Sequence, residues 1–442
     1  MKTLLFNTVI VVFMLLYSNG LQAQTAKQVK QMAYADSLRL VEIFKDIHQN
    51  PELGFMEVRT SGIVTKELKS LGYEVITGIG KTGVVGILKN GEGQVVMYRA
   101  DMDCIPVKEV TGLSYASNKT MRKEDGTEVP VMHACGHDAH VTWMLGVAKI
   151  MVALKSEWNG TLVFVAQPAE ELGQGAKSMI DDKMYEKGVP IPDYLLALHA
   201  LPLPVGTIQN GIGERLAGAN ILDVTFFGIG GHGAFPELTK DPIIMASSAV
   251  LQYQTIISRN IAPQDAAVIT VGAFQSGAAG NVIPPSALLK ITTRWFNEKT
   301  KTIIMDGIKN INDGIAVANN LPKELYPKIT ILGSVNAVVN NEGMVNKINT
   351  ALTKVIDPNS IMSNKPAIMA SEDFSLLCIE NSKTVYDYIF VGIANIEMST
   401  KAKQEGKEYP FIYHNGNFQV DLTAIPLGTA IGTIALLEMF KK

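Results

Sequence analysis

The stretch 131–140 brings together residues that can bind a metal ion. It contains three histidines, one cysteine and one aspartate, although the whole chain has only seven histidines and three cysteines. Cys135 and His137 are two residues apart across a glycine, so both side chains can reach one centre. Thiolate and imidazole are ligands that zinc accepts, as do manganese, cobalt and nickel to a lesser degree. This density predicts a metal site. The less favoured alternative is a loop whose histidines only cap the following helix.

Four further residues can complete such a site. Glu170 and Glu171 follow a predicted strand and a proline, so we expect their carboxylates to point to different sides of the backbone. One of them could then bind metal while the other moves protons. His199 ends an apolar strand, and His414 lies in a polar turn before the last helix. One thiolate, three imidazoles and a carboxylate exceed the needs of one tetrahedral site. They suit two ions about 3.5 Å apart that share a water.

The elements that must position these residues alternate between helix and strand. This order predicts an α/β sheet with its ligand site at the carboxyl ends of the strands. The apolar helix after the histidine-rich stretch puts that stretch at a helix N-terminus, where anionic ligands are favoured. The predicted helices are 27–48, 60–71, 141–154, 342–356 and 421–441, and the predicted strands are 84–88, 95–98, 160–166, 195–199 and 388–392.

A different pattern occupies 213–334. Its order is strand, helix, two strands, helix and strand, which predicts a ferredoxin-like α+β domain. The corresponding ranges are 220–228, 242–258, 267–274, 288–295, 300–318 and 328–332. We therefore expect this domain to be inserted into an α/β domain made of 24–212 and 335–442. Two domains are also what a chain of 442 residues predicts.

Residues 1–23 have the features of a cleavable signal peptide. Lys2 is followed by a nearly uninterrupted apolar run at 4–17, and 21–23 resembles a small-residue cleavage site before Gln24. We expect a soluble protein that is exported to the periplasm or secreted, with no stable membrane anchor after cleavage. An uncleaved N-terminal anchor is the alternative.

The charge and the cysteine content exclude other classes of protein. The formal net charge is −3 without a basic run, so nucleic acid is a poor candidate partner. The three cysteines cannot form a disulfide framework, although one pair could oxidise.

Eight segments, in order over nearly the whole mature chain, resemble one enzyme family. They are 48–54, 99–103, 133–138, 167–171, 198–199, 231–236, 281–284 and 371–375. The most specific are Cys-Gly-His-Asp at 135–138 and Pro-Ala-Glu-Glu at 168–171. Together they resemble the amidohydrolase branch of the dinuclear metallo-aminoacylase/carboxypeptidase family. That branch includes hippurate hydrolases, N-acyl-amino-acid amidohydrolases and indole-acetyl-amino-acid hydrolases.

The resemblance implies roles for specific residues. It implies a catalytic domain with a central mixed sheet, like that of the zinc exopeptidases, and an inserted lid through which the family commonly dimerises. Glu170 would be the general base, His232 a donor to the oxyanion on lid closure, and Asn281 and Arg294 the residues that hold the substrate carboxylate. The implied ligands of two divalent ions, zinc or manganese ahead of cobalt or nickel, are Cys135, His137, Glu171, His199 and His414. Apart from the resemblance, Asp103 could orient a ligand.

The sequence departs from the family at two positions near the site. Tyr413-His414-Asn415 stands where His-His-Pro is usual, and Cys104 stands where alanine is usual. Both changes bear mainly on the substrate class.

These residues predict a metal-dependent amidohydrolase that removes the acyl group from small-molecule N-acyl amino acids. A metal-activated water would attack the amide, with Glu170 taking its proton. A carboxypeptidase or dipeptidase on the same scaffold stays open, because both cleave an amide next to a free carboxylate. A cysteine hydrolase using Cys135 and His137 lacks an evident third group. A binding protein without activity would be favoured only if Glu170 or a ligand were missing.

Overall fold

The computed structural model describes residues 24–441. The predicted signal peptide therefore lies outside the described residues. The described chain forms two compact units. The first comprises the residues up to Gly213, Val339–Lys365 and the residues from Leu376, and the second comprises Glu214–Val338 and Pro366–Ser375.

The domain boundaries expected from the sequence assign Pro366–Ser375 to the α/β domain. In the structure this segment belongs to the second unit. Backbone contacts tie it to the second unit. Leu216 and Ile368 form a parallel bridge, and the Ala217 N–H donates to the Ala370 carbonyl at 2.8 Å.

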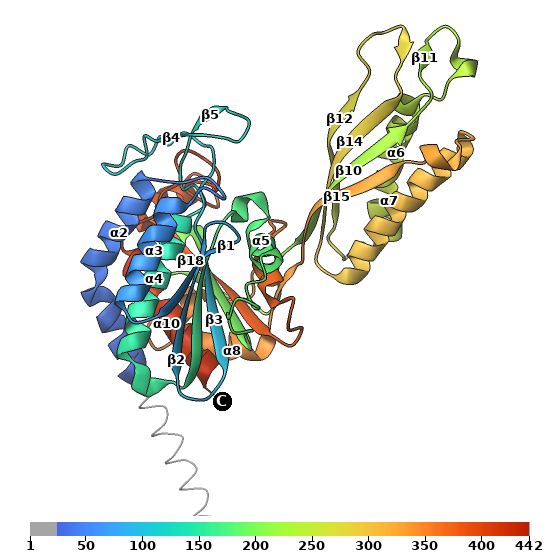
Figure 1. Cartoon of the computed structure of the whole chain (residues 1–442). Helices are drawn as coiled ribbons and strands as arrows, with labels where there is room; N and C mark the ends of the chain where they lie inside the picture. Colours follow the sequence, from blue (N-terminus) through green and yellow to red (C-terminus); the bar gives the residue numbers. More distant parts are fainter. Residues whose placement is uncertain (1–23, 442) are drawn as a thin grey trace, which may run out of the picture. The chain divides into compact units, whose positions relative to one another are not determined.

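An eight-stranded mixed sheet lies at the centre of the first unit (Figure 1). Four neighbouring strands, β6, β3, β7 and β18, run parallel, whereas β1, β2 and β8 run antiparallel to a neighbour. The predicted α/β class with a mixed central sheet is confirmed. In spatial order the strands are β1 (Glu74–Ile79), β2 (Gly83–Asn90), β6 (Gly160–Gln167), β3 (Val95–Asp101), β7 (Tyr194–Pro204), β18 (Val385–Ala394), β8 (Ile208–Gln209) and β17 (Ile361–Met362).

Helices supply the rest of this core. Buried aromatic side chains such as Tyr98, Trp143 and Phe164 fill the space between helices and sheet. The helix predicted over 27–48 is interrupted at Asp36, so residues 24–35 form one helical segment and α2 the next. The longer helices are α2 (Ser37–Gln49), α3 (Val58–Ser70), α4 (His137–Ala153), α8 (Glu342–Leu352) and α10 (Ala424–Phe440), and the shorter ones are α5 (Gly175–Asp181) and α9 (Ile396–Gln404).

Two boundaries differ from those expected near the predicted ligands. Helix α4 begins at His137, four residues before the predicted start, because Gly136 turns the chain with a φ of 90°. A Cβ at Gly136 would also lie 2.6 Å from that of Ala200, so this position requires glycine. Strand β7 continues five residues beyond His199, which therefore lies within the strand and not at its end.

The second unit has the predicted ferredoxin-like topology. Its antiparallel sheet has the order β12 (Val268–Ser276), β14 (Ser286–Trp295), β10 (Gly218–Phe227) and β15 (Lys328–Val335). Helices α6 (Pro242–Thr255) and α7 (Glu298–Ala318) pack against this sheet, and each begins with a side-chain cap. A short two-stranded antiparallel sheet of β11 (Gly231–His232) and β13 (Val282–Ile283) extends from one end of the unit (Figure 1).

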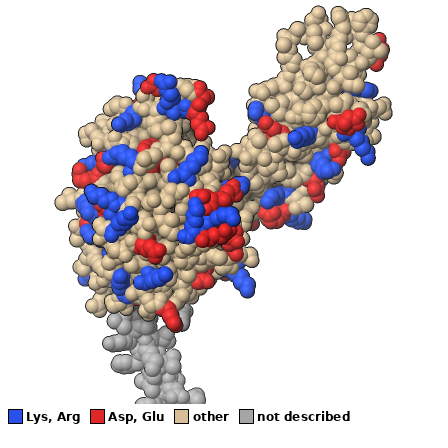
Figure 2. Space-filling model, viewed as in Figure 1, with Lys and Arg blue, Asp and Glu red and all other residues tan. Residues whose placement is uncertain are grey.

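The surface shows mixed charge. On the face in Figure 2, basic and acidic side chains are interspersed. Within residues 24–441, no helix combines the length and the apolar character needed to cross a membrane.

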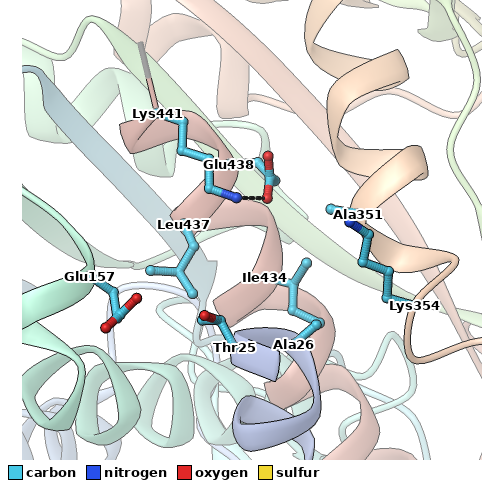
Figure 3. Close-up of a pocket in the computed structure, with 9 residues that line it drawn as sticks. All are labelled: Thr25, Ala26, Glu157, Ala351, Lys354, Ile434, Leu437, Glu438 and Lys441. Carbon is cyan, nitrogen blue, oxygen red and sulfur yellow. Dashed lines mark hydrogen bonds and ion pairs between the residues drawn. The ribbon is translucent and has the colours of Figure 1, made fainter. Parts of the chain in front are cut away.

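A pocket of about 190 Å³ lies where residues 25–26 approach α10 (Figure 3). Its lining includes the apolar Ile434 and Leu437 and the ion pair Glu438–Lys441. It contains none of the residues that the sequence predicts for chemistry.

We expect Gly428→Ala to destabilise the first unit by about 1–3 kcal/mol, as for overpacking of a core. Gly428 lies in α10 against Trp143 of α4, and an added Cβ would lie 2.3 Å from the indole ring. Gly62→Ala is the matched control, because this helical glycine of α3 has no atom within 4 Å of an added Cβ. Gly62→Ala should raise the free energy of unfolding of the first unit by about 0.4–1 kcal/mol. Thermal or urea unfolding measures both, and equal stabilities would contradict the close packing of α4 and α10.

Candidate metal centre

The five predicted ligands lie together at one edge of the central sheet. Strand β3 ends at Asp101, which pairs with Gln167 at the end of β6. Arg99 of β3 pairs with Ala197 of β7. His199, two residues further along β7, therefore lies level with Asp101 at the end of β3. The loops that follow these strands, together with the start of α4 and the turn at His414, carry the other ligands.

The ligand atoms form two groups that share a thiolate. Cys135, His137 and His199 form one group, and Cys135, Glu171 and His414 form the other, with all ligand atoms of a group within 4.8 Å of one another. Cys135 Sγ lies 3.6 Å from His199 Nε2, and His414 Nε2 lies 3.2 Å from Glu171 Oε2. The structure therefore brings all five predicted ligands together.

Two buried atoms in this cluster have no hydrogen-bond partner. They are His137 Nε2 and Glu171 Oε1, and 3.9 Å separates them. That distance is too long for a hydrogen bond. His137 and Glu171 belong to different ligand groups, so a cation bound in each group would satisfy both atoms. The donor set of thiolate, imidazole and carboxylate fits a divalent transition metal.

Hydrogen bonds orient two of the imidazoles for metal binding. His199 Nδ1 lies 2.8 Å from the Ala200 carbonyl, and His137 Nδ1 lies 2.8 Å from the Asp103 carbonyl. A carbonyl only accepts, so Nδ1 carries the proton in both rings. When the ring is neutral, the lone pair of each Nε2 then faces the cluster, as a metal ligand requires.

The sequence did not single out the residues that hold the Ala200 peptide. The Ala200 N–H donates to His140 Nε2 at 2.7 Å, and His140 Nδ1 donates to Asp101 Oδ1 at 2.5 Å. The Tyr413 hydroxyl donates to the Ala200 carbonyl at 2.6 Å. Asp101 and His140 lie in the segments 99–103 and 131–140, and Tyr413 is one of the departures from the family pattern. These positions in the sequence could have drawn attention to the three residues.

Buried carboxylates give the cluster a strong preference for cations. Burial favours the neutral form of His137, yet Asp101 and Asp103 outweigh it and raise the pKa of His137 to about 10. Burial, with the neighbouring His140, lowers the pKa of His199 well below its usual value. A divalent ion would take the place of the proton on His137.

Glu170 and Glu171 both reach into the cluster. Glu170 Oε2 lies 3.8 Å and Glu171 Oε1 lies 3.9 Å from His137 Nε2. The expectation that the two carboxylates point to different sides is therefore wrong. The chain forms a 3₁₀ turn over Glu170–Leu172, after an Ala169 with a φ of 49°, and not an extended strand.

Asp103 connects this turn to the metal ligands, as an orienting residue would. Its Oδ1 accepts from the Glu170 N–H at 3.1 Å, and its Oδ2 accepts from the Glu171 N–H at 3.0 Å. Its own carbonyl accepts from His137.

The remaining predicted residues lie in the second unit, and their roles stay predictions. His232 is exposed, and its Nδ1 accepts from the Ala234 N–H at 3.0 Å, so Nε2 carries the ring proton and can donate. The Asn281 carbonyl accepts from the Gly233 N–H. Arg294 donates to the Met369 carbonyl and to Ser371 Oγ.

Within the second unit, Arg294 lies far from His232 and Asn281. His232 and Asn281 lie by the small β11–β13 sheet, beyond the start of β14, whereas Arg294 lies near the end of β14. The intervening length of β14 is roughly 25 Å. A single copy of this unit therefore does not bring Asn281 and Arg294 together.

Comparison with known proteins gives consistent matches. Residues 97–408 match the model of the protein family described as "Peptidase family M20/M25/M40". The chain is 38% identical over 352 residues to a hippurate hydrolase of Campylobacter jejuni, which covers 79% of this chain and 87% of that protein. It is 33% identical over 362 residues to an IAA-amino acid hydrolase of Arabidopsis thaliana, covering 79% and 77%.

A solved structure shows the same fold. A Bacillus subtilis protein described as a dinuclear metal binding peptidase from the M20 family superimposes with a TM-score of 0.72 at 24% identity. The match covers 92% of this chain and 99% of that chain.

Proposed function

Since the chain belongs to peptidase family M20/M25/M40, in its amidohydrolase branch, we propose that it hydrolyses the amide bond of N-acyl amino acids such as hippurate. The observation that carries this proposal is the cluster around His137, where five ligands meet and the carboxylate of Glu170 lies beside them. The similarity to a hippurate hydrolase supports the substrate class.

Two divalent ions, zinc or manganese ahead of cobalt or nickel, would be held by Cys135, His137, Glu171, His199 and His414. Bound ions supply hydroxide at neutral pH by lowering the pKa of water to near 7.

The chain's own residues handle the protons and the charge. Glu170 takes a proton from the attacking water and returns it to the leaving amine nitrogen, which expels the amino acid. His232 donates from Nε2 to the oxygen on which negative charge develops. Arg294 has a planar guanidinium that suits the free carboxylate of the substrate.

A hydrolysis screen tests the proposed function. The metal-free protein would be reloaded with zinc or manganese and given N-acyl amino acids, their carboxamide analogues and dipeptides. Cleavage of the N-acyl amino acids, with the carboxamides much poorer, is the expected result. Faster cleavage of dipeptides with a free α-amino group would show instead a dipeptidase or carboxypeptidase on this scaffold.

We also propose a homodimer in which the partner copy supplies His232 and Asn281 to the site that contains Arg294. The separation of these residues along β14 supports this arrangement, because two copies can bring opposite ends of the unit to one substrate. A symmetric dimer would then contain two composite sites.

Mixing two inactive variants tests this arrangement. We expect His232→Ala to lower kcat by ~10²-fold, as for loss of an oxyanion donor. When His232→Ala is mixed with Glu170→Gln and allowed to exchange subunits, about a quarter of parental activity should return, because half of the dimers have one intact site. The matched control mixes Glu170→Gln with Glu171→Ala, which should regain nothing. No recovery in the first mixture would place His232 in the same copy as the metals.

Export is a separate proposal, supported by the apolar run at 4–17 and the small-residue site before Gln24. The mature protein should begin at Gln24 and accumulate outside the cytoplasm. Intact-mass measurement of the exported protein checks this, and retention of 1–23 would contradict it.

A further inference from the structure

Two buried carboxylates hold the turn that carries Glu170. The N–H groups of Ala169, Glu170 and Glu171 point in succession to Glu57 Oε1 at 2.8 Å, Asp103 Oδ1 at 3.1 Å and Asp103 Oδ2 at 3.0 Å. Glu57 is fully buried and precedes helix α3, more than a hundred residues away along the chain.

The bond from Ala169 matters because of the conformation at this residue. Ala169 has a φ of 49°, in the left-handed region that alanine rarely adopts. It is completely buried, so no water can replace a lost partner of its N–H. This residue sets the direction in which the chain enters the Glu170–Leu172 turn.

The negative charge of Glu57 does not stabilise the folded state. Burial and the nearby Asp103 charge raise the pKa of Glu57 to about 7. Two carboxylates in one buried region oppose folding at neutral pH, because each is desolvated near a like charge. Thr82 donates to the other oxygen of Glu57, which leaves Oε1 directed at Ala169.

We propose that Glu57 is a positioning residue for the reaction, because its bond to Ala169 fixes the left-handed turn that aims Glu170 and Glu171 at the metal centre. This inference rests on the proposed function of that centre. The carboxylate of Glu57 accepts from the Ala169 N–H and from Thr82, so it acts on Glu170 and Glu171 through the backbone.

The first test compares three variants. Glu57→Ala should lower kcat by ~10-fold to 10²-fold at saturating metal with little change in KM, as for a catalytic group displaced by about 1 Å. Glu57→Gln should behave like the parent, since its amide oxygen can still accept from Ala169. Glu52→Ala is the matched control, because Glu52 accepts from the Arg59 and Thr60 N–H groups at the start of the same helix. It should lower the melting temperature and leave kcat unchanged.

The second test separates positioning from a purely structural role. Glycine adopts a positive φ without strain. Ala169→Gly should therefore recover several-fold of the kcat lost in Glu57→Ala, and no recovery would count against a role of Glu57 through this turn. If Glu57→Ala does not fold, Glu57→Asp, which is one methylene shorter, takes its place in the same comparison.

Zinc affinity gives a readout that needs no substrate. Calorimetric titration of the metal-free protein should show weaker binding in Glu57→Ala by ~10–100-fold, since Glu171 shares the turn. If the parent cleaved no N-acyl amino acid, the proposed function would fail, while this titration would still decide the role of Glu57. A folded Glu57→Ala or Glu57→Asp variant with parental zinc affinity would overturn the proposal.

Discussion

Replacing Glu170 by glutamine is expected to lower kcat by ~10²–10⁴-fold, the usual contribution of a general acid–base group. Glutamine has the same shape but cannot take a proton from water. The Glu170 carboxylate lies beside the metal cluster, with Oε2 3.8 Å from His137 Nε2, and its N–H is held by Asp103. The backbone bond is kept in the variant, so metal content and KM should change little.

Glu171→Ala is the matched control for this experiment. Its carboxylate accepts from His414 and faces the unpartnered His137 Nε2, so its removal should reduce metal occupancy. Steady-state kinetics and elemental analysis on the same preparations distinguish the two outcomes. A Glu170→Gln variant with parental kcat would contradict its role as general base, whatever its metal content.

The fold was largely predictable because its signals are local. Alternation of apolar strands and helices indicated the central sheet, and the order of elements in 213–334 indicated the ferredoxin-like unit. The errors occurred where a single residue or a distant contact decides the structure. Gly136 moves the start of α4 back to His137, and the segment Pro366–Ser375 belongs to the second unit through pairing with residues about 150 positions earlier in the chain.

For the candidate site, the residue types indicated which side chains could bind metal. The sequence did not indicate the directions in which these side chains point. The side chains of Cys135 and His137 are recognisable because few other residues bind soft metals. The directions of Glu170 and Glu171 depend on the left-handed Ala169, and alanine gives no local sign of that conformation. Glu57, which holds Ala169, resembles any other glutamate before a helix. Such partners become visible only when segments far apart in sequence are placed together.

The two ligand groups lead to a prediction about metal stoichiometry. Cys135 belongs to both groups, whereas His199 and His414 each belong to one. We therefore expect Cys135→Ala to lose both ions and all activity, and His199→Ala and His414→Ala each to retain about one ion per chain. Activity should fall by orders of magnitude in all three, because water activation and charge stabilisation depend on the pair of ions.

Chelation of the parent protein is the reference for these variants. Removal of the metals should abolish hydrolysis, and addition of zinc or manganese should restore it with about two ions per chain. Cys104→Ala is the matched cysteine control, since Cys104 is buried and belongs to neither group, and it should keep both ions. Elemental analysis after gel filtration measures each case. Two ions retained in Cys135→Ala would show that the thiolate is not shared, and the imidazoles and Glu171 would then have to hold both metals without it.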